Sequence, residues 1–308
     1  MIVVAGESLI DLIVAADGRV EAIPGGGPYN VARALGRLRR PVAFLGRLST
    51  DRFGATLRAG LATDGVGLDL APATDAPTLL AVAELDTAGA ATYHFYVDGT
   101  AAPGLSAADV RHGLPADATA LHVGTLGLVF DPMATTIEGL VLTSRPDVLV
   151  MADPNCRPTA ITDPAAYRAR LKRILGRVDV VKVSVDDLAW LDPGSDPVEA
   201  ARRLMDTGPA AALVTDGGRP VRLMTSGGVM ELEVPRVRVV DTVGAGDAFG
   251  AGFLAAWTGA ALGRSDLGDR SALAAATRFA IEVGSRTTTR AGAEPPTLAE
   301  LEGVAGLW

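Results

Sequence analysis

The chain has 308 residues, of which 48% are hydrophobic and 21% charged, the balance of a globular protein with a sizeable buried core. Its formal net charge of −8 argues against a nucleic-acid partner, because phosphate backbones are bound by clusters of lysine and arginine. The single cysteine, Cys156, excludes an intramolecular disulfide and fits a reducing cytoplasm, and His94, His112 and His122 are too far apart to suggest a metal motif.

The N-terminal sequence MIVVAG predicts a strand from the start, with no basic segment before it, so we expect no secretory signal. The nearly uncharged stretch from Val243 to Gly263 is long enough to span a bilayer. It is nevertheless rich in glycine and alanine and carries Asp247, which would be costly in lipid. We therefore expect no membrane partner and a helix packed on a sheet.

Short apolar runs alternate along the chain with stretches of helical spacing. Residues 28–39 place three apolar side chains on one stripe, and residues 51–62 repeat the spacing behind a cap at Asp51. The alternation predicts an α/β fold with a doubly wound, mostly parallel sheet and helices on both faces, whose ligands bind at the carboxyl ends of the strands. The predicted strands include Val42–Gly46, Ala120–Gly124, Val148–Ala152, Val178–Val183 and Ala211–Thr215.

Two segments, at about residues 9–23 and 78–97, break the alternation and predict antiparallel strands, the second pair turning near Asp86–Gly89. A small β-sheet lid that projects from the main body accounts for both. No internal repeat or long linker separates other parts of the chain, so residues 1–308 are expected to form a single domain with the lid strands inserted.

The segment from Asp241 to Trp257 carries the most informative motif, D-T-V-G-A-G-D. It predicts a strand that ends at Asp241, a glycine turn, and a helix that begins near Gly246 with unpaired N–H groups at its N-terminus. Asp247 could accept the proton of an attacking hydroxyl, while the amides of Ala245, Gly246 and Asp247 stabilise a phosphoryl group. The alternative is structural, because aspartate favours helix starts and glycine permits close packing.

A second glycine loop, Gly25-Gly-Gly-Pro-Tyr-Asn30, leads into a helix with proline in its first turn. It is not the dinucleotide fingerprint, which would follow the first strand directly, whereas about twenty residues separate the loop from the strand end at Ala5. A nucleotide-dependent oxidoreductase is thereby disfavoured. The P-loop sequence G-x-x-x-x-G-K-[ST] is absent as well.

Together these motifs resemble the ribokinase or PfkB family of carbohydrate kinases over almost the whole chain. Asp241–Leu254 matches the C-terminal signature of that family in full, and Gly26–Ala32 matches the core of the N-terminal one. Arg39 and Ser49 stand where the family usually has glycine. The resemblance implies a ribokinase-like fold and an ATP-dependent sugar kinase in which Asp247 is the general base and the Gly244–Asp247 amides form the anion hole.

The resemblance also implies a sugar site. Asp11 is expected to accept sugar hydroxyl hydrogen bonds, which an ionised carboxylate can do twice, and its alternative is a solvated charge on the lid. Gly26, Gly27 and Asn30 would complete the pocket, or form only a turn and a helix cap. Phe95 on the lid strand is expected to cover the sugar, although packing between the lids of two subunits, as a homodimer, explains the aromatic residues equally well.

Asp153-Pro-Asn155-Cys-Arg157 resembles the D-x-N-x-R element of fructokinases and 2-keto-3-deoxygluconate kinases. It follows a predicted strand at its carboxyl end, and Asn155 and Arg157 are therefore expected to contact the substrate. Arg157 offers a planar fork for a carboxylate or phosphate, with a structural salt bridge as the alternative.

The nucleotide and metal sites follow from the same resemblance. Lys182-Val-Ser184-Val-Asp186-Asp187 resembles the N-x-x-E element, in which the acidic residue orients water around Mg²⁺. Asp187 is favoured over Asp186, and a helix cap is the alternative. A monovalent cation such as K⁺ is placed around Asp241 and Val243. The residues expected to bind ATP are Lys182, Ser184, Thr215, Gly217, Gly218, Gly244, Gly246 and Gly292.

The choice of sugar depends on which basic residues are present. A sugar phosphate would need several, and only Arg47 and Arg157 are candidates, so a free sugar is favoured. A fructose-like ketohexose is expected, because the Gly-Gly-Gly-Pro-x-Asn loop and the Asp-Pro-Asn-x-Arg element look most like those of fructokinases. This chain has Val97 where 2-keto-3-deoxygluconate kinases usually carry an arginine, which counts against the acidic sugar but also removes a residue seen in many fructokinases. The alternatives are 2-keto-3-deoxygluconate, ribose and nucleosides, and also a sugar sensor without turnover, which would lose the base that Asp247 supplies.

Overall fold

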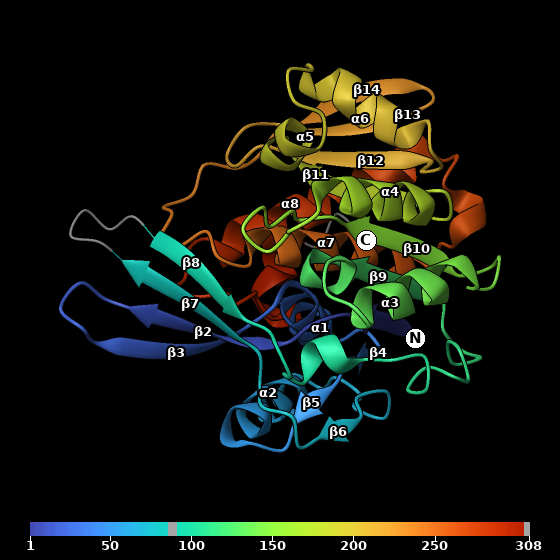
Figure 1. Cartoon of the computed structure of the whole chain (residues 1–308). Helices are drawn as coiled ribbons and strands as arrows, with labels where there is room; N and C mark the ends of the chain where they lie inside the picture. The colour runs from blue at the N-terminus through green and yellow to red at the C-terminus, as the bar shows by residue number, and fades with distance from the viewer. Residues whose placement is uncertain (86–90, 305–308) are drawn as a thin grey trace.

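The computed structural model describes residues 1–85 and 91–304. Within them, eight strands form a central sheet in the order β14-β13-β12-β11-β10-β9-β1-β4 (Figure 1). The strands from β12 to β4 pair in parallel, whereas β13 and β14 are antiparallel at one edge. The strands are β1 (Ile2–Ala5), β4 (Val42–Leu45), β9 (Ala120–Gly124), β10 (Leu149–Asp153), β11 (Val180–Ser184), β12 (Ala211–Thr215), β13 (Val221–Thr225) and β14 (Gly228–Leu232).

Helices cover both faces of the sheet, which explains why its parallel strands are mostly apolar and buried. In β1, Ile2 and Val4 pack into a core shared with α1, α7 and α8, whereas Val3 and Ala5 pack into the core on the side of α3, α4 and α6. The helices are α1 (Gly27–Arg37), α2 (Arg52–Thr63), α3 (Met133–Leu142), α4 (Pro164–Leu175), α5 (Val185–Leu191), α6 (Pro197–Met205), α7 (Ala245–Gly259) and α8 (Arg270–Thr287), with 3-10 turns η1 (Ala102–Gly104), η2 (Thr125–Leu128), η3 (Arg264–Asp266) and η4 (Leu298–Val304).

The predicted α/β architecture is confirmed. The five predicted parallel strands correspond to β4, β9, β10, β11 and β12, with small shifts at their ends. The two helices predicted behind them are α1 and α2, and the Asp51 side chain caps α2 by accepting a hydrogen bond from the Gly54 N–H.

One predicted strand is wrong. Residues 233–241 have no regular secondary structure, and the strand expected to end at Asp241 is absent. The N–H groups of Val240 and Asp241 both donate to the carbonyl of Thr288, and Val239 and Val240 are exposed. A valine-rich run has high β-propensity, but this segment lies where no neighbouring strand offers a ladder.

Four strands form the lid: β2 (Leu9–Val14), β3 (Val20–Gly25), β7 (Leu80–Leu85) and β8 (Ala91–Tyr96), in the order β3-β2-β7-β8. The lid projects to one side of the main body (Figure 1), and its two hairpin pairs are antiparallel as predicted, while β2 and β7 pair in parallel. The predicted turn near Asp86–Gly89 lies outside the described residues. Two short strands, β5 (Leu48–Ser49) and β6 (Ala73–Thr74), pair below it.

The lid is fixed to the body at the beginning of β7. The Asp51 carboxylate accepts hydrogen bonds from the Thr78 N–H at 2.8 Å and from the Thr78 hydroxyl at 2.7 Å. On the neighbouring strands, β2 follows β1 after three residues and β3 runs directly into the loop before α1. All four lid strands are therefore joined to the body at the same end.

In the described part of the chain, no helix is long and apolar enough to cross a membrane. The uncharged stretch that begins at Val243 instead forms α7, which packs against α1 and α8 with its residues from Ala248 to Trp257 buried. The expectation of a helix packed in the body of the protein is confirmed.

Candidate active site

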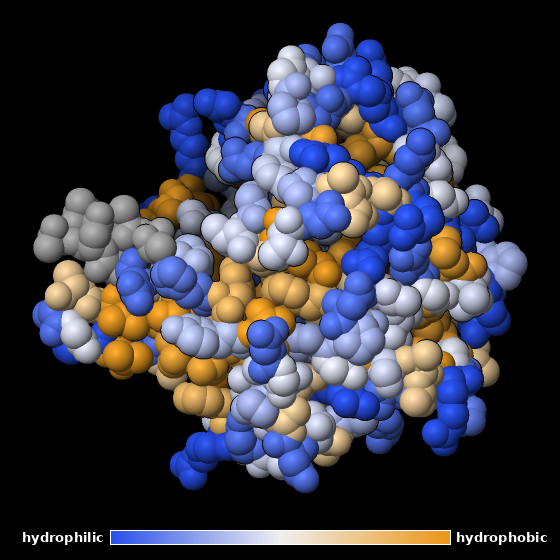
Figure 2. Space-filling view, viewed as in Figure 1, coloured by the Kyte–Doolittle hydropathy of each residue, from blue (hydrophilic) through white to orange (hydrophobic). Residues whose placement is uncertain are grey.

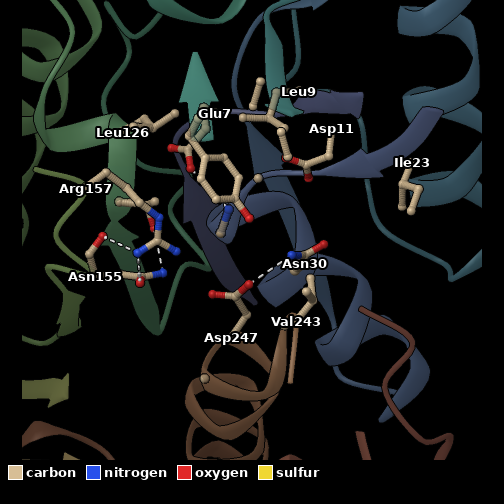
Figure 3. A pocket seen from close by; sticks show the side chains of 18 of the residues that line it. Glu7, Leu9, Asp11, Ile23, Asn30, Leu126, Asn155, Arg157, Val243 and Asp247 are labelled. Atoms are coloured by element: carbon tan, nitrogen blue, oxygen red, sulfur yellow. Dashed lines mark hydrogen bonds between the residues drawn. The ribbon is translucent and has the colours of Figure 1, made fainter. Parts of the chain in front are cut away.

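A cleft of about 660 Å³ lies at the carboxyl ends of the central strands, between the body and the lid. This volume is typical of a small-molecule site. Figure 3 shows side chains from β2, α1, α7 and the segment after β10 converging on it. Of the residues expected to bind ligands, the cleft is lined by Asp11, Gly26, Gly27, Asn30, Phe95, Asn155, Arg157, Lys182, Asp241, Val243, Gly244, Gly246, Asp247 and Gly292.

Asp247 lies in the first turn of α7 and is only 7% exposed. Burial raises the pKa of this carboxyl above its ordinary value, and the hydrogen bond from Asn30 and the charges of Lys182 and Arg157 oppose the rise. The Asn30 side-chain amide donates to Asp247 Oδ2 at 2.9 Å (Figure 3). A buried, oriented carboxylate with a raised pKa is suited to accept a proton.

The N-terminus of α7 begins at Gly244, whose φ of 72° is left-handed. A Cβ at this position would lie 2.4 Å from the Cβ of Ala293, so both conformation and packing require glycine. No side chain caps the helix, which leaves the N–H groups of Gly246 and Asp247 free among the described residues. The N–H of Ala245 donates weakly to Thr242 at 3.2 Å, so two of the three predicted amides are fully free.

A buried lysine lies directly beneath this helix start. Lys182 on β11 is 4% exposed and donates to Asp153 Oδ2 at 2.8 Å. Burial opposes the charge, but the carboxylates of Asp153, Asp187 and Asp247 outweigh burial and raise the pKa of Lys182. A Cβ at Gly246 would lie 2.8 Å from Lys182 Nζ, so the ammonium and the free amides face the same small space.

Asp11 reaches the cleft from β2, on the lid side. Burial raises its pKa to about 6, and the charge of Arg157 opposes the rise. The carboxylate is half-buried, and a Cβ at Gly25 would lie 2.2 Å from Asp11 Oδ2, so the glycine loop makes room for it. Asp11 is therefore built into the cleft wall and is not a solvated charge.

Glu7 is a cleft residue that our sequence reasoning missed. It is completely buried, its Oε1 accepts from the Gly27 N–H at 3.1 Å, and its Oε2 accepts from the Gly127 N–H at 2.8 Å. Burial raises the pKa of Glu7 to about 7. The available signal was an acidic residue two positions after the end of a buried strand. Thr125, buried at the end of β9 with a φ of 50°, was missed as well.

Arg157 and Asn155 lie together after β10. Arg157 donates to Asn155 Oδ1 at 2.6 Å and forms no ion pair with the described residues, so the salt-bridge alternative is wrong. Its guanidinium stays exposed at the cleft (Figure 3). Arg47, the other candidate for an anionic substrate, instead pairs with Asp109 and is not a cleft residue.

Asp187 caps a helix, which is the alternative role predicted for it. Its Oδ1 accepts from the Cys156 N–H at 2.7 Å, and its Oδ2 accepts from the N–H and hydroxyl of Ser184. The Asp187 N–H in turn donates to Ser184 Oγ at 3.0 Å, and this bond and the one from the Ser184 N–H form the capping box of α5. Asp186 is exposed. The described residues contain no group of three or more side chains that could hold a metal ion.

Asp241 and Val243, where a monovalent cation is predicted, lie beside the segment that contains Gly292. The Oδ1 of Asp241 accepts from the Val243 N–H at 3.0 Å, and its Oδ2 accepts from the Gly292 N–H at 2.8 Å. The other residues that we expect to bind the nucleotide do not line the cleft, but lie at the carboxyl ends of the next strands of the sheet. They are Ser184 at the end of β11, Thr215 at the end of the neighbouring β12, and Gly217 and Gly218 after β12.

The lid contributes the apolar wall of the cleft. Phe95, as predicted, and Tyr93 come from one face of β8, and Ala81 and Ala83 come from β7. His94, the neighbour between the two aromatic residues, is exposed. The predicted alternation of the lid strand is therefore confirmed.

The chain is similar to known proteins over almost its whole length. The family described as pfkB family carbohydrate kinase matches residues 1–300. A fructokinase of Rhizobium leguminosarum bv. trifolii is 35% identical over 259 residues, which cover 83% of this chain and 79% of that relative.

Solved structures agree with the fold. The fructokinase of Xylella fastidiosa with bound ATP superposes with a TM-score of 0.89 at 30% identity, covering 98% of this chain and 97% of that one. The fructokinase of Vibrio cholerae O395 in a form with bound fructose, ADP and calcium ion gives 0.86 at 27% identity, with 98% and 97% covered.

Proposed function

The chain belongs to the pfkB family of carbohydrate kinases and has its ribokinase-like fold, and from this premise we propose that it transfers a phosphoryl group from ATP to a hydroxyl of fructose. One observation carries the proposal. The buried carboxylate of Asp247, held by Asn30, lies in the same helix turn as two free amides, and Lys182 lies below them. A proton acceptor and an anion site therefore meet at one point.

On the sugar side, Asp11 accepts hydrogen bonds from sugar hydroxyls and fixes the ring against the lid. The hydroxyl that is phosphorylated points to Asp247, which accepts its proton as the oxygen attacks phosphorus. The amides of Gly246 and Asp247 stabilise the negative charge of the phosphoryl oxygens, and Lys182 adds a fixed positive charge below them. Arg157, with its fork free of carboxylate partners, binds the phosphoryl group from the opposite side.

The nucleotide fits the glycine-lined start of α7, where side chains at Gly244 and Gly246 would fill the space. Mg²⁺ would be bound mainly by the phosphates and water, as is usual for this ion, and would supply charge neutralisation in the transferring group. Asp187 would act through water, since its Oδ1 accepts only one hydrogen bond from the described residues. A K⁺ ion beside Asp241 would stabilise the contact between the Val243 and Gly292 segments.

Fructose is favoured over an anionic sugar by the charges of the cleft. Among its described lining residues, Lys182 is paired with Asp153, and Arg157 is the remaining cation. A sugar phosphate or sugar acid would therefore compete with ATP for one arginine. The fructokinase relative supports the same choice.

A substrate panel with MgATP tests the proposal. We expect fructose to give the highest kcat/KM among fructose, 2-keto-3-deoxygluconate, ribose and a nucleoside, with the phosphorylated hydroxyl identified by ³¹P–¹H NMR. Binding of fructose without ADP release would instead indicate a sugar sensor. A higher kcat/KM for another substrate of the panel would contradict fructose while leaving the kinase reaction in place.

We also propose that two copies pair through their lids. Figure 2 shows apolar surface gathered on the projecting strands, and Val20 and Tyr96 are each 61% exposed there. Large exposed apolar side chains that cluster on a thin sheet favour association. Light scattering should give the mass of a dimer, and Tyr96→Lys should shift it towards the monomer.

A further inference from the structure

Glu7 is the one fully buried carboxylate of the described cleft lining that the proposed reaction does not use. It follows β1 directly and has its two oxygens occupied by main-chain N–H groups from different segments. One belongs to Gly27, at the start of α1, and the other to Gly127, in η2 after β9. A single side chain thus joins the ends of two neighbouring strands to the glycine loop of the sugar pocket.

The glycine loop in turn lies close to the proposed base. A Cβ at Gly27 would lie 3.4 Å from Asp247 Oδ1 and 2.3 Å from Thr125 Oγ1. Almost no free space therefore remains between Gly27 and these two side chains. Asn30 lies three residues later on α1, one helical turn along, and donates to Asp247 Oδ2 at 2.9 Å. Any movement of the first turn of α1 therefore changes the distance between Asn30 and the base.

We propose that Glu7 is a positioning residue that holds the first turn of α1 and thereby keeps Asn30 and the Gly27 backbone against Asp247. This inference rests on the proposed phosphoryl transfer. Glu7 touches neither the sugar nor the phosphoryl group, and it acts through α1. An ionised carboxylate suits this role because it has acceptors only, and both of its neighbours are donors.

The energetic cost of Glu7 supports a functional reason for keeping it. Burial of an ionised carboxylate destabilises the folded protein unless its hydrogen bonds compensate. Burial is the largest influence on Glu7, the two amide bonds oppose it, and the nearby charge of Asp247 makes ionisation harder still, so the pKa stands at about 7. A residue that served packing alone would be replaced at lower cost by an apolar side chain of similar volume.

The test compares Glu7→Gln and Glu7→Asp with a matched control, Asp179→Asn. The glutamine variant keeps the length but places an NH₂ group against a donor, whereas the aspartate variant keeps the charge and shortens the reach. Asp179 is also a buried carboxylate, 4% exposed, that accepts a main-chain N–H, from Val150 at 2.8 Å. It lies just before β11, at the amino-terminal ends of the parallel strands, whereas the cleft lies at their carboxyl ends.

We expect both Glu7 variants to lower kcat with fructose by about tenfold or more and to leave the KM for MgATP within about twofold, because a small displacement of a reacting group is costly. Asp179→Asn should lower the melting temperature and leave both kinetic constants unchanged below the transition. Glu7→Gln and Asn30→Ala should be non-additive in kcat, since both act on one contact.

Hydrogen exchange of the parent and Glu7→Gln gives a readout that does not depend on the substrate. The segment 26–31 should exchange faster in the variant while segments of α8 keep their protection. If the parent phosphorylates no sugar of the panel, the proposed function fails, yet this exchange result still decides whether Glu7 holds α1. Unchanged kcat in a folded Glu7→Gln protein, additive effects with Asn30→Ala, or failure of both Glu7 variants to fold would each overturn the positioning role.

Discussion

Replacing Asp247 by asparagine removes the proposed base while keeping its shape. The variant amide oxygen can still accept the hydrogen bond that Asn30 donates at 2.9 Å. The free N–H groups at the start of α7 are main-chain groups and remain in place. The substitution therefore isolates proton acceptance from binding.

The expected effect on the rate is much larger than the expected effect on stability. Loss of a general base lowers the rate by about 10²- to 10⁴-fold, which corresponds to a barrier higher by about 2.7 to 5.4 kcal/mol. Stability should hardly fall. Loss of a negative charge in the first turn of a helix costs about 0.3–1 kcal/mol, but burial raises the pKa of Asp247, so its removal also relieves the cost of ionising a buried group.

The assay combines kcat from coupled ADP release, calorimetric titration of fructose and ATP, and thermal melting. Steep loss of turnover with both ligands still bound is the expected result. The pH profile of the parent adds a second check. Since ionised Asp247 is the active form and its pKa is raised above the ordinary 3.8, kcat/KM should rise with pH along an acid limb centred above that value. The residual activity of the variant should lack this limb.

Turnover of Asp247→Asn within a few-fold of the parent would refute the base assignment. A melting temperature lowered by many degrees, with activity lost in proportion to unfolding, would indicate instead that the carboxylate serves the helix start.

Three further substitutions test other parts of the cleft. Asp11→Ala should raise the KM for fructose at least about tenfold while the Kd of ATP stays within about twofold, because the lost hydrogen bonds are made to the sugar; equal losses for both ligands in calorimetry would mark Asp11 as structural. Arg157→Ala should lower kcat and move the acid limb of kcat/KM to higher pH, since the positive charge of Arg157 holds down the pKa of Asp11 and Asp247. Stability should change by no more than about 0.5 kcal/mol, because Arg157 is exposed and forms no ion pair with the described residues. Gly246→Ala should lower kcat sharply by placing a methyl group 2.8 Å from Lys182 Nζ, although alanine favours the helix by about 1 kcal/mol. Gly139→Ala, in a helix where a Cβ would meet no atom within 4 Å, is the matched control and should leave kcat unchanged.

The main sheet could be predicted because its strands are apolar on both faces, so their burial is visible in the sequence itself. The same rule failed for residues 233–241, because β-propensity reports how a side chain fits a sheet and carries no information on whether a neighbouring strand is present. Pairing between β2 and β7 was also beyond prediction, since it joins strands that are far apart in the sequence.

The candidate site was predictable where a glycine-rich loop and a carboxylate share one short motif, as at Gly244–Asp247. The capping bonds of Asp187 were not, because the spacing that suits a carboxylate near a metal also suits a capping box, and the bonds to Ser184 and Cys156 are visible only in the structure. Glu7 was missed for a related reason. Its partners Gly27 and Gly127 contribute N–H groups, which every residue except proline carries, so the sequence gives no sign of the contact.

Attachment of all four lid strands at one end makes the lid a cantilever, clamped where Thr78 is bound to Asp51. Strand β2 has six residues and so extends about 20 Å at roughly 3.3 Å per residue. The deflection of a clamped plate grows steeply with distance from its support. Asp11, the third residue of β2, lies near the support, so any bending of the lid would displace it less than the far end of the strand. The contact that we propose between Asp11 and the sugar would therefore be the part of the lid least disturbed by bending.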